Sequence, residues 1–214
     1  MAEVLNASSL TLREVYERFP LEEHVQPDLG AYLDLEPLPD IGASRLELIR
    51  QSWRRSLFQG LLNEGCVKFL TVSPLLMEAG YLGSSDVRTL LEEKIAEIAI
   101  ESDDRVIRGR MDVLVLQNPS DRPSLCVLII EAKNSTVNVL EGLPQLLVYI
   151  HTFLDKQKSV WGLLTTGTDY TFVRLQQGSY QLFKGLNLLF PDDSKILLQA
   201  LIAIRKLQPE PVVD

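Results

Sequence analysis

The stretch Leu125–Lys133, LCVLIIEAK, decides the fold. Its first six residues are apolar without polar alternation, which is typical of a strand in the middle of a sheet, buried on both faces. Because side chains alternate along a strand, Glu131 and Lys133 project from the same face, about 7 Å apart, while Ala132 points away. Charges at the end of a buried strand are costly unless they are paired or bind a metal. The stretch therefore predicts a candidate site as well as a central strand.

The patterns on either side of this strand predict alternating helices and strands. In chain order, the predicted elements are helices over Leu10–Phe19, Ser44–Asn63 and Glu64–Ala79, a short helical turn over Asp86–Glu93, strands over Lys94–Ser102, Val106–Gln117 and Leu125–Lys133, a helix over Val139–Lys156, a strand over Ser159–Thr166, a hairpin of Tyr170–Gln176 and Ser179–Phe183, and a helix over Asp193–Leu207. Pro74 removes one helical hydrogen bond, so we expect a kink or a new helix start there.

This order of elements predicts an α/β fold. Three meandering strands, a crossover helix and a fourth strand give a mixed four-stranded core sheet flanked by helices, followed by a C-terminal hairpin and helix. Several prolines interrupt the first 60 residues, and we interpret residues 1–60 as an N-terminal helical extension. The remaining residues, 61–214, form the predicted main domain.

Composition excludes several classes of function. The 214 residues include 21 basic and 29 acidic side chains, a net charge of -8, which argues against a polybasic coat protein but leaves room for a local basic groove. Two cysteines and two histidines cannot supply a disulfide framework, a four-cysteine zinc site or a three-histidine metal site. The apolar runs are too short to span a bilayer, and the first residues do not resemble a signal peptide. We therefore expect a cytoplasmic protein without a membrane partner.

A second carboxylate is predicted to meet the end of the central strand. If Val106–Gln117 pairs antiparallel with Leu125–Lys133, residue 112 lies opposite about Ile130, which brings Asp112 next to Glu131. Two adjacent carboxylates repel each other, and a hard divalent cation with oxygen ligands relieves that repulsion. Mg²⁺ or Mn²⁺ is the natural candidate. The alternative interpretation is an ordinary salt bridge between Lys133 and one of the two carboxylates.

Three further features lie near this point of the predicted fold. Gln145 and Tyr149 are four residues apart on the next helix, hence on one face; they either contact a substrate or are ordinary solvated and core residues. Glu64 begins a predicted helix, where either it is a helix N-terminal charge favoured by the dipole or it reaches the site. Arg105, Arg108 and Arg110 precede Asp112 and either contact phosphates or form a charged hairpin end. The pattern leaves each pair of alternatives open.

Taken together, these residues resemble a known superfamily. Asp112 followed by Glu131-Ala132-Lys133 on the next strand resembles the PD-(D/E)xK nuclease core, found in restriction endonucleases and DNA-repair nucleases. Gln145-Leu-Leu-Val-Tyr149 matches the Gln-x-x-x-Tyr motif of RecB-type and type I restriction nuclease domains. The layout is also similar to that of small stand-alone cyanobacterial members. The resemblance covers roughly residues 61–183 and departs from the family at Met111, where the motif has proline.

The resemblance implies a restriction endonuclease-like core and a role for each matching residue. Asp112, Glu131 and the Ala132 carbonyl would ligate Mg²⁺ or Mn²⁺, and Glu64 would act through a metal-bound water or a second metal. Lys133 would position the attacking water and stabilise charge on the phosphate. The last two residues of the predicted site, Gln145 and Tyr149, would orient the substrate strand.

Three hypotheses for the function follow. The first is a metal-dependent DNA endonuclease, with a homodimer as one way to cut both strands. The second is a catalytically inactive protein of the same fold that serves as a binding or scaffold subunit, an interpretation favoured by the overall acidity and by the lack of a recognisable DNA-reading domain. The third is an unrelated α/β protein in which the motif arose by chance.

Overall fold

The main element of the fold is one large mixed sheet. The computed structural model describes residues 3–26, 28–95, 98–99, 105–117 and 125–212. The eight-stranded sheet has the order β2-β10-β9-β8-β7-β6-β3, and β11 pairs with β9 beside this path. Its strands are β2 (Glu22–Gln26), β3 (Val87–Lys94), β6 (Arg110–Gln117), β7 (Cys126–Ala132), β8 (Ser159–Thr165), β9 (Asp169–Gln176), β10 (Ser179–Phe183) and β11 (Leu186–Asn187).

A second, three-stranded sheet and the helices complete the molecule. The small sheet has the order β1-β5-β4, with bounds Glu3–Asn6, Arg105–Arg108 and Ile98–Ala99. The helices are α1 (Leu12–Arg18), α2 (Asp40–Gln59), α3 (Glu64–Val67), α4 (Ser73–Glu78), α5 (Leu143–His151) and α6 (Pro191–Lys206). A π turn, Lys68–Val72, joins α3 to α4, and 3-10 turns cover Ala7–Ser9, Leu29–Ala31 and Val139–Gly142.

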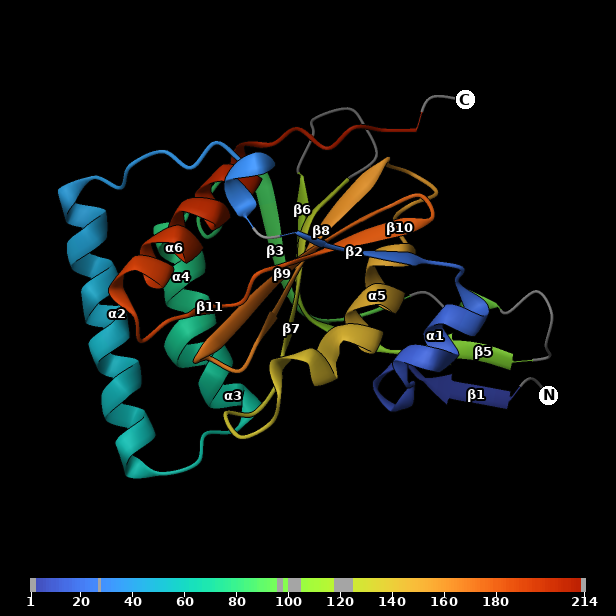
Figure 1. Cartoon of the computed structure of the whole chain (residues 1–214), viewed down its shortest axis with the longest axis horizontal. Helices are drawn as coiled ribbons and strands as arrows, with labels where there is room; N and C mark the ends of the chain where they lie inside the picture. Colours follow the sequence, from blue (N-terminus) through green and yellow to red (C-terminus); the bar gives the residue numbers. More distant parts are fainter. Residues whose placement is uncertain (1–2, 27, 96–97, 100–104, 118–124, 213–214) are drawn as a thin grey trace.

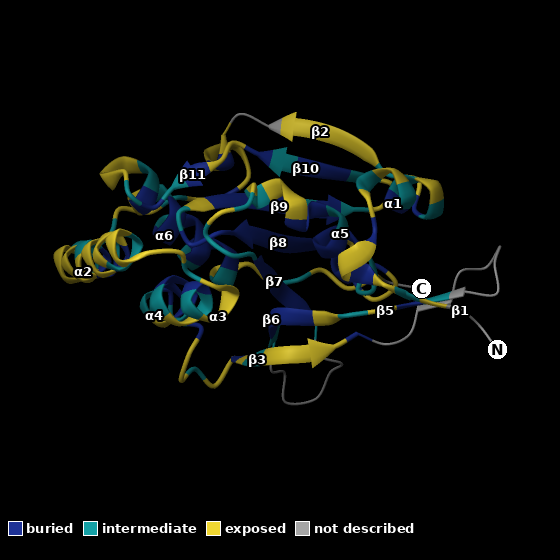
Figure 2. Cartoon of the chain, turned by 90° about the horizontal axis from the view of Figure 1, so that it is seen from below, coloured by how far each residue is buried: buried dark blue, intermediate teal, exposed yellow. Residues whose placement is uncertain are grey.

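The main sheet lies between two layers that each bury an apolar core. Figures 1 and 2 show α2, α3, α4 and α6 on one side of the sheet, and α1, α5 and the small sheet on the other. Trp53 and Leu201 belong to the first core, and Leu146 and Ile150 belong to the second. Every residue of β7 is buried, as expected for a strand covered on both faces.

The strands that carry the predicted site pair as the sequence indicates. β6 and β7 are antiparallel, with Val113 opposite Ile130, so Asp112 and Glu131 are neighbours across the ladder. β7 and β8 are parallel, joined through α5, and β8 and β9 are antiparallel. The prediction of a mixed α/β sheet is therefore confirmed, although the observed sheet is larger than the expected four-stranded core.

Two of the predicted elements before the site are wrong. Asp86–Glu93 is not a helical turn, because Val87–Lys94 forms strand β3 at the sheet edge. Its Leu-Leu-Glu-Glu-Lys sequence favours a helix locally, but pairing with β6 overrides that propensity. Of the strand predicted over Lys94–Ser102, the described part is strand only at Lys94 and in Ile98–Ala99, the latter in the small sheet. The predicted loop at 118–123 lies outside the described residues.

The N-terminal 60 residues are not purely helical. They contain β1 and β2 as well as α1 and α2, and β2 extends the main sheet by pairing parallel with β10.

The predicted disturbance of the helix near Pro74 is confirmed: a π turn, Lys68–Val72, precedes a new helix, α4. Pro74 has no amide hydrogen to donate to the Leu70 carbonyl. In the wider turn before it, the Ser73 amide donates to the carbonyl of Lys68, five residues back.

Candidate functional site

Asp112 lies where β6 meets the end of β7. Its Oδ2 atom accepts a hydrogen bond from the Ala132 amide at 2.8 Å, so the carboxylate is fixed against the backbone of the neighbouring strand. At this end of β7 the Ala132 amide points toward β6 and donates to Asp112, whereas the next amide, that of Lys133, donates to the Thr165 carbonyl of β8. Asp112 is only 8% exposed, and hydrogen bonds of this kind offset the cost of burying a polar group.

Glu131 is the most deeply buried charged group of the site, at 2% exposure. Its Oε1 atom accepts a hydrogen bond from Lys133 Nζ at 2.7 Å, while its Oε2 atom is buried without a hydrogen-bond partner among the described residues. Burial and the adjacent charge of Asp112 raise the pKa of Glu131 to about 8, although Lys133 opposes this rise. One oxygen of a buried carboxylate is therefore left for a ligand.

A chain of hydrogen bonds runs from this carboxylate into α5. Lys133 Nζ donates to Gln145 Oε1 at 2.9 Å, and Gln145 Nε2 donates to the Tyr149 hydroxyl at 2.7 Å. The Tyr149 hydroxyl donates to the Arg110 carbonyl at 3.0 Å and accepts from the Arg110 amide at 3.1 Å. Burial, followed by the charge of Glu131, raises the pKa of Tyr149 to about 12, so the hydroxyl keeps its proton. The structure brings Glu131, Lys133, Gln145 and Tyr149 into one polar network.

Close packing holds α5 at this distance from the strands. A Cβ atom at Gly162 of β8 would meet Ile150 Cδ1 at 2.5 Å and Leu146 Cδ2 at 2.9 Å, so the helix lies directly over the strand backbone. Gly142, at the start of the helix, lies over Glu131: a Cβ atom there would be 3.2 Å from Glu131 Cγ. The two glycines let the helix and its leading turn cover the carboxylate.

Glu64 faces the site without joining the network. It is exposed at the start of α3, where its carbonyl accepts from the Lys68 amide, and its side chain has no hydrogen bond or ion pair to another described residue. Its charge nevertheless contributes to the raised pKa of Glu131, which puts the two carboxylates within electrostatic range. The structure therefore places Glu64, an exposed residue, at the edge of the site.

Lys68 and Glu92 are site residues that the sequence analysis missed. Lys68 Nζ donates to Asp112 Oδ1 at 2.7 Å and also to Glu92 Oε1. Burial lowers the pKa of Lys68, but the hydrogen bonds and charges of Asp112 and Glu92 outweigh that effect and raise it overall. The available signal was the spacing of Lys68, which lies one helical turn after Glu64 and hence on the same face. Glu92 gave no such signal, because its segment was predicted as a helical turn.

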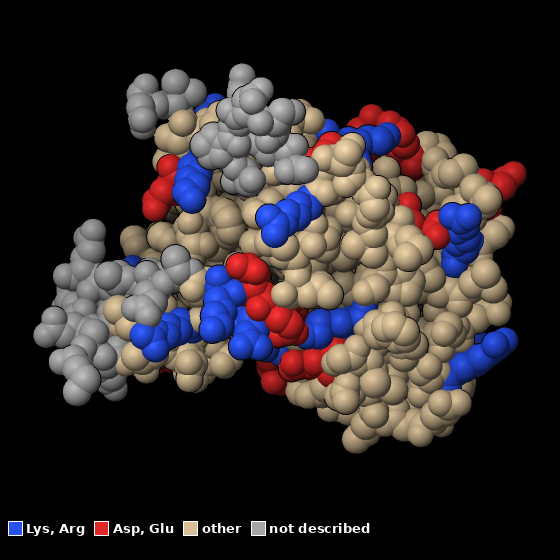
Figure 3. Space-filling model, turned by 180° about the vertical axis from the view of Figure 1, so that it is seen from behind, with Lys and Arg blue, Asp and Glu red and all other residues tan. Residues whose placement is uncertain are grey.

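A cleft of about 650 Å³ opens beside the network. Gln145 and Tyr149 form part of its lining, and Lys94, Arg108 and Arg110 supply positive charge. On the face in Figure 3, Lys and Arg side chains form a row with Asp and Glu side chains beside them, so the charge there is mixed. The side chain of Arg105 lies outside the described part of the chain.

The donors present are of the kind that a hard divalent cation prefers. Asp112, Glu131 and the Ala132 carbonyl supply oxygen ligands, and the partnerless Glu131 Oε2 atom is the observation that fits a bound cation. Within the described residues, no group of three or more His, Cys, Asp or Glu side chains could hold a metal ion. Any metal site here therefore relies on two carboxylates with backbone or water oxygens, or on a movement of Glu64.

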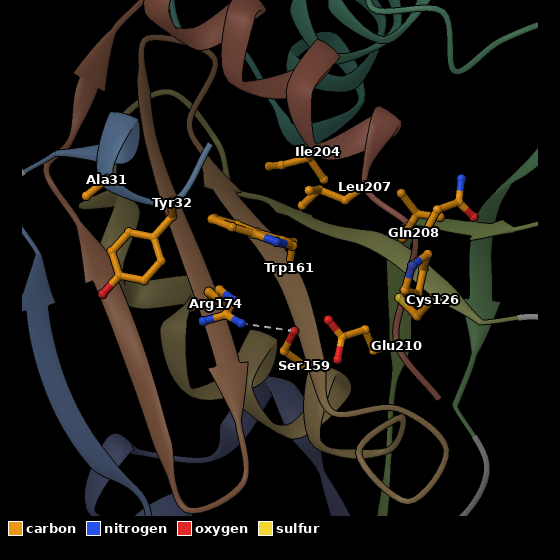
Figure 4. Close-up of a pocket in the computed structure, with 12 residues that line it drawn as sticks. Ala31, Tyr32, Cys126, Ser159, Trp161, Arg174, Ile204, Leu207, Gln208 and Glu210 are labelled. Atoms are coloured by element: carbon orange, nitrogen blue, oxygen red, sulfur yellow. Dashed lines mark hydrogen bonds between the residues drawn. The ribbon is translucent and has the colours of Figure 1, made fainter. Parts of the chain in front are cut away.

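A second cavity, of about 340 Å³, lies at the opposite end of the sheet, near the starts of β7 and β8 (Figure 4). Arg174 donates to Ser159 Oγ at 3.4 Å and lies over the Tyr32 ring, 5.8 Å from its centroid. Trp161, Gln208 and Glu210 also line this cavity. None of the predicted site residues lines this cavity.

Comparison with known proteins gives no relative from which a function could be proposed, so the proposal below rests on the geometry of the site. No protein-family model and no curated protein matches this chain. Within the described part of the chain, none of the helices combines the length and the apolar character needed to cross a membrane.

Proposed function

We propose that this chain is a metal-dependent DNA endonuclease of the PD-(D/E)xK type, which hydrolyses phosphodiester bonds. The observation that carries the proposal is the buried pair Asp112 and Glu131, with an oxygen of Glu131 left without a partner and Lys133 bound to the other. This pair lies at the end of a central strand, next to a cleft that contains three basic side chains. The resemblance of the Gln145 and Tyr149 motif to nuclease domains supports the same function.

The chain's own residues have distinct roles in this proposal. Asp112, Glu131 and the Ala132 carbonyl would hold Mg²⁺ or Mn²⁺, which when bound supplies an activated water and neutralises phosphate oxygens. Lys133, oriented by Glu131 and Gln145, would direct its ammonium group at the charge that develops on the phosphate. Tyr149 orients Gln145 and keeps its own proton. Arg108 and Arg110 in the cleft would bind backbone phosphates.

The test is cleavage of duplex and single-stranded DNA with Mg²⁺ or Mn²⁺. Asp112→Asn and Glu131→Gln should abolish cleavage, and Lys133→Met should slow it by at least about 100-fold. Glu210→Gln is the matched control, because this exposed carboxylate pairs with Lys158 at the other end of the sheet. Cleavage that survives in the Asp112 and Glu131 variants would contradict the proposal.

A second candidate function is that of a catalytically inactive binding or scaffold subunit with the same architecture. It is favoured by the ammonium of Lys68 on Asp112 and by the absence, within the described residues, of a three-ligand acidic cluster. DNA or protein binding without cleavage under any metal condition would support this candidate. A homodimer stays a prediction, which sedimentation at several protein concentrations would test.

A further inference from the structure

A lysine occupies the outer oxygen of Asp112. Lys68 Nζ lies 2.7 Å from Asp112 Oδ1, and its side chain is 22% exposed, against 11% for that of Asp112. The inner oxygen, Oδ2, is already taken by the Ala132 amide. An ion at Asp112 would therefore have to approach the oxygen that Lys68 holds.

Two backbone irregularities place the lysine there. The π turn begins at Lys68, and such turns occur frequently at functional sites. Glu92, the second carboxylate bound by Lys68, is the sole described non-glycine residue with a positive φ, at 55°. It lies in β3 between Leu91, opposite Val113, and Glu93, opposite Met111, and so next to Asp112. Strained backbone conformations of this kind tend to persist at sites with a function.

The two lysines of the site divide the two carboxylates between them. Lys133 is bound to Glu131 and to Gln145, which keeps it on the α5 side. Lys68 is bound to Asp112 and Glu92, on the β3 side. Because Glu92 offers a second anionic partner, Lys68 can leave Asp112 and still remain paired.

We propose that Lys68 is an internal cation that competes with the divalent metal for Asp112, with Glu92 holding the ammonium when the metal is bound. This inference rests on the proposed function and deepens it, because it names the residue that sets metal affinity. Two positive charges at contact distance from one carboxylate oxygen repel each other, so each weakens the binding of the other. The free energy of metal binding is then the difference between the interaction of the metal with Asp112 and the interaction of Lys68 with Asp112.

The experiment is calorimetric titration of the full chain with Mn²⁺ in the absence of nucleic acid. Lys68→Met should tighten Mn²⁺ binding by at least about tenfold, because the competitor is gone. Lys68→Arg should weaken Mn²⁺ binding by about threefold or more, because a guanidinium binds carboxylates bidentately. Lys158→Met is the control: it also removes a lysine that pairs with a carboxylate, Glu210 at 2.9 Å, but at the other end of the sheet, and should leave the Mn²⁺ affinity unchanged.

Thermal unfolding without metal provides the second readout. Lys68→Met should lower the melting temperature, since Asp112 and Glu92 lose their shared partner, and saturating Mn²⁺ should restore most of that loss. If Lys68→Met folds poorly, the Mn²⁺ affinity of Lys68→Arg, which retains the positive charge, tests the inference by itself.

The outcomes separate the inference from the proposed function. Equal Mn²⁺ affinity in wild type and both Lys68 variants would overturn the inference while leaving metal-dependent cleavage intact. Loss of binding in Lys68→Met would also overturn it, because Lys68 would then support the metal site. Absence of Mn²⁺ binding in every variant, with no cleavage by the wild type, would overturn the proposed function and the inference together.

Discussion

Tyr149 shows how a single residue can serve both the fold and the candidate site. Its hydroxyl has three hydrogen-bond partners. Two of them are the amide and the carbonyl of Arg110, the first residue of β6. The third, Gln145, connects it to Lys133. A tyrosine at this helical position therefore anchors the strand that carries Asp112 and also orients the amide that holds the lysine.

Tyr149→Phe should lower the free energy of unfolding by about 1–3 kcal/mol, since backbone groups of Arg110 lose their partner. Cleavage should also slow, because Gln145 loses its orientation. Urea unfolding measures the first effect. Tyr32→Phe is the matched control: the Tyr32 ring is 37% exposed, and the change should stay within about 0.5 kcal/mol. Equal effects of the two substitutions would contradict this role for Tyr149.

His151 predicts a pH dependence of stability. Burial lowers its pKa below the ordinary value of 6.5, and Asp155 opposes this only in part; the ring packs on Phe19, with centroids 4.3 Å apart. The folded state thus binds this proton less readily than the unfolded state does. The contribution of the neutral ring is complete above pH 6.5 and is lost as the pH falls toward the lowered pKa. Wild type should therefore lose more stability than His151→Gln between about pH 7.5 and 5. Denaturant unfolding at both pH values measures this difference, and parallel losses would refute it.

At the residue scale, the sequence predicted the part of the site that lies on contiguous patterns. The apolar run of Leu125–Lys133 and the short connection to the preceding strand were enough to place Asp112 beside Glu131. Helical spacing was enough to place Gln145 beside Tyr149. The contact between Lys68 and Glu92 could not be predicted, because it depends on the edge pairing of β3 with β6, on the π turn at Lys68 and on the positive φ of Glu92.

At the scale of elements, the contact between α5 and β8 decides where Gln145 and Tyr149 lie. The crossover helix approaches the sheet closely because β8 has glycine at the crossing point, residue 162. Ridges of Leu146 and Ile150 fill the space that a side chain there would occupy. The depth of this packing therefore controls the distance between the helix and the end of β7.

Gly162→Ala should cost about 1–3 kcal/mol by overpacking and should reduce cleavage by moving α5. Gly185→Ala is a matched control, because a Cβ atom there would meet nothing closer than 3.6 Å. Stability is measured by denaturant unfolding and activity by the DNA assay. If the two alanine variants behave alike, close packing of α5 does not control the site.

Elements with strong local patterns were predicted well, and elements made by distant partners were not. The helix Leu12–Arg18 was predicted from the helical spacing of its apolar residues, and it begins two residues later than predicted, after a capping box of Thr11 and Glu14. β2, in contrast, is an exposed polar segment that becomes a strand only because β10 pairs with it, with Glu23 opposite Tyr180. Its pairing partner lies more than 150 residues away along the chain, so no local pattern could reveal it.

For the whole molecule, the N-terminal 60 residues are part of both apolar cores. Val15 and Ala7 are fully buried on the α5 side, and Trp53 is fully buried on the other. Trp53 packs against Gly167 and donates from Nε1 to Thr168 Oγ1 at 3.0 Å. The segment thus helps to hold the ends of β8 and β9 in place.

Trp53→Ala should therefore lower the free energy of unfolding by about 3–5 kcal/mol. Phe58→Ala on the same helix is the matched control, because Phe58 is 82% exposed and its loss should be nearly neutral. Thermal unfolding of both variants measures the contrast. A small effect of Trp53→Ala would mean that α2 is an accessory to an independently stable sheet.

The hydrogen bond from the Ala132 amide to Asp112 has a spectroscopic consequence. The chemical shift of an amide proton depends on the charge around the oxygen that accepts it, so the Ala132 amide signal reports what is bound to Asp112. Displacement of the Lys68 ammonium and arrival of a cation at Asp112 should each shift the signal of this amide. The chemical shift of the Ala132 amide therefore allows cation binding at the end of β7 to be followed without any substrate.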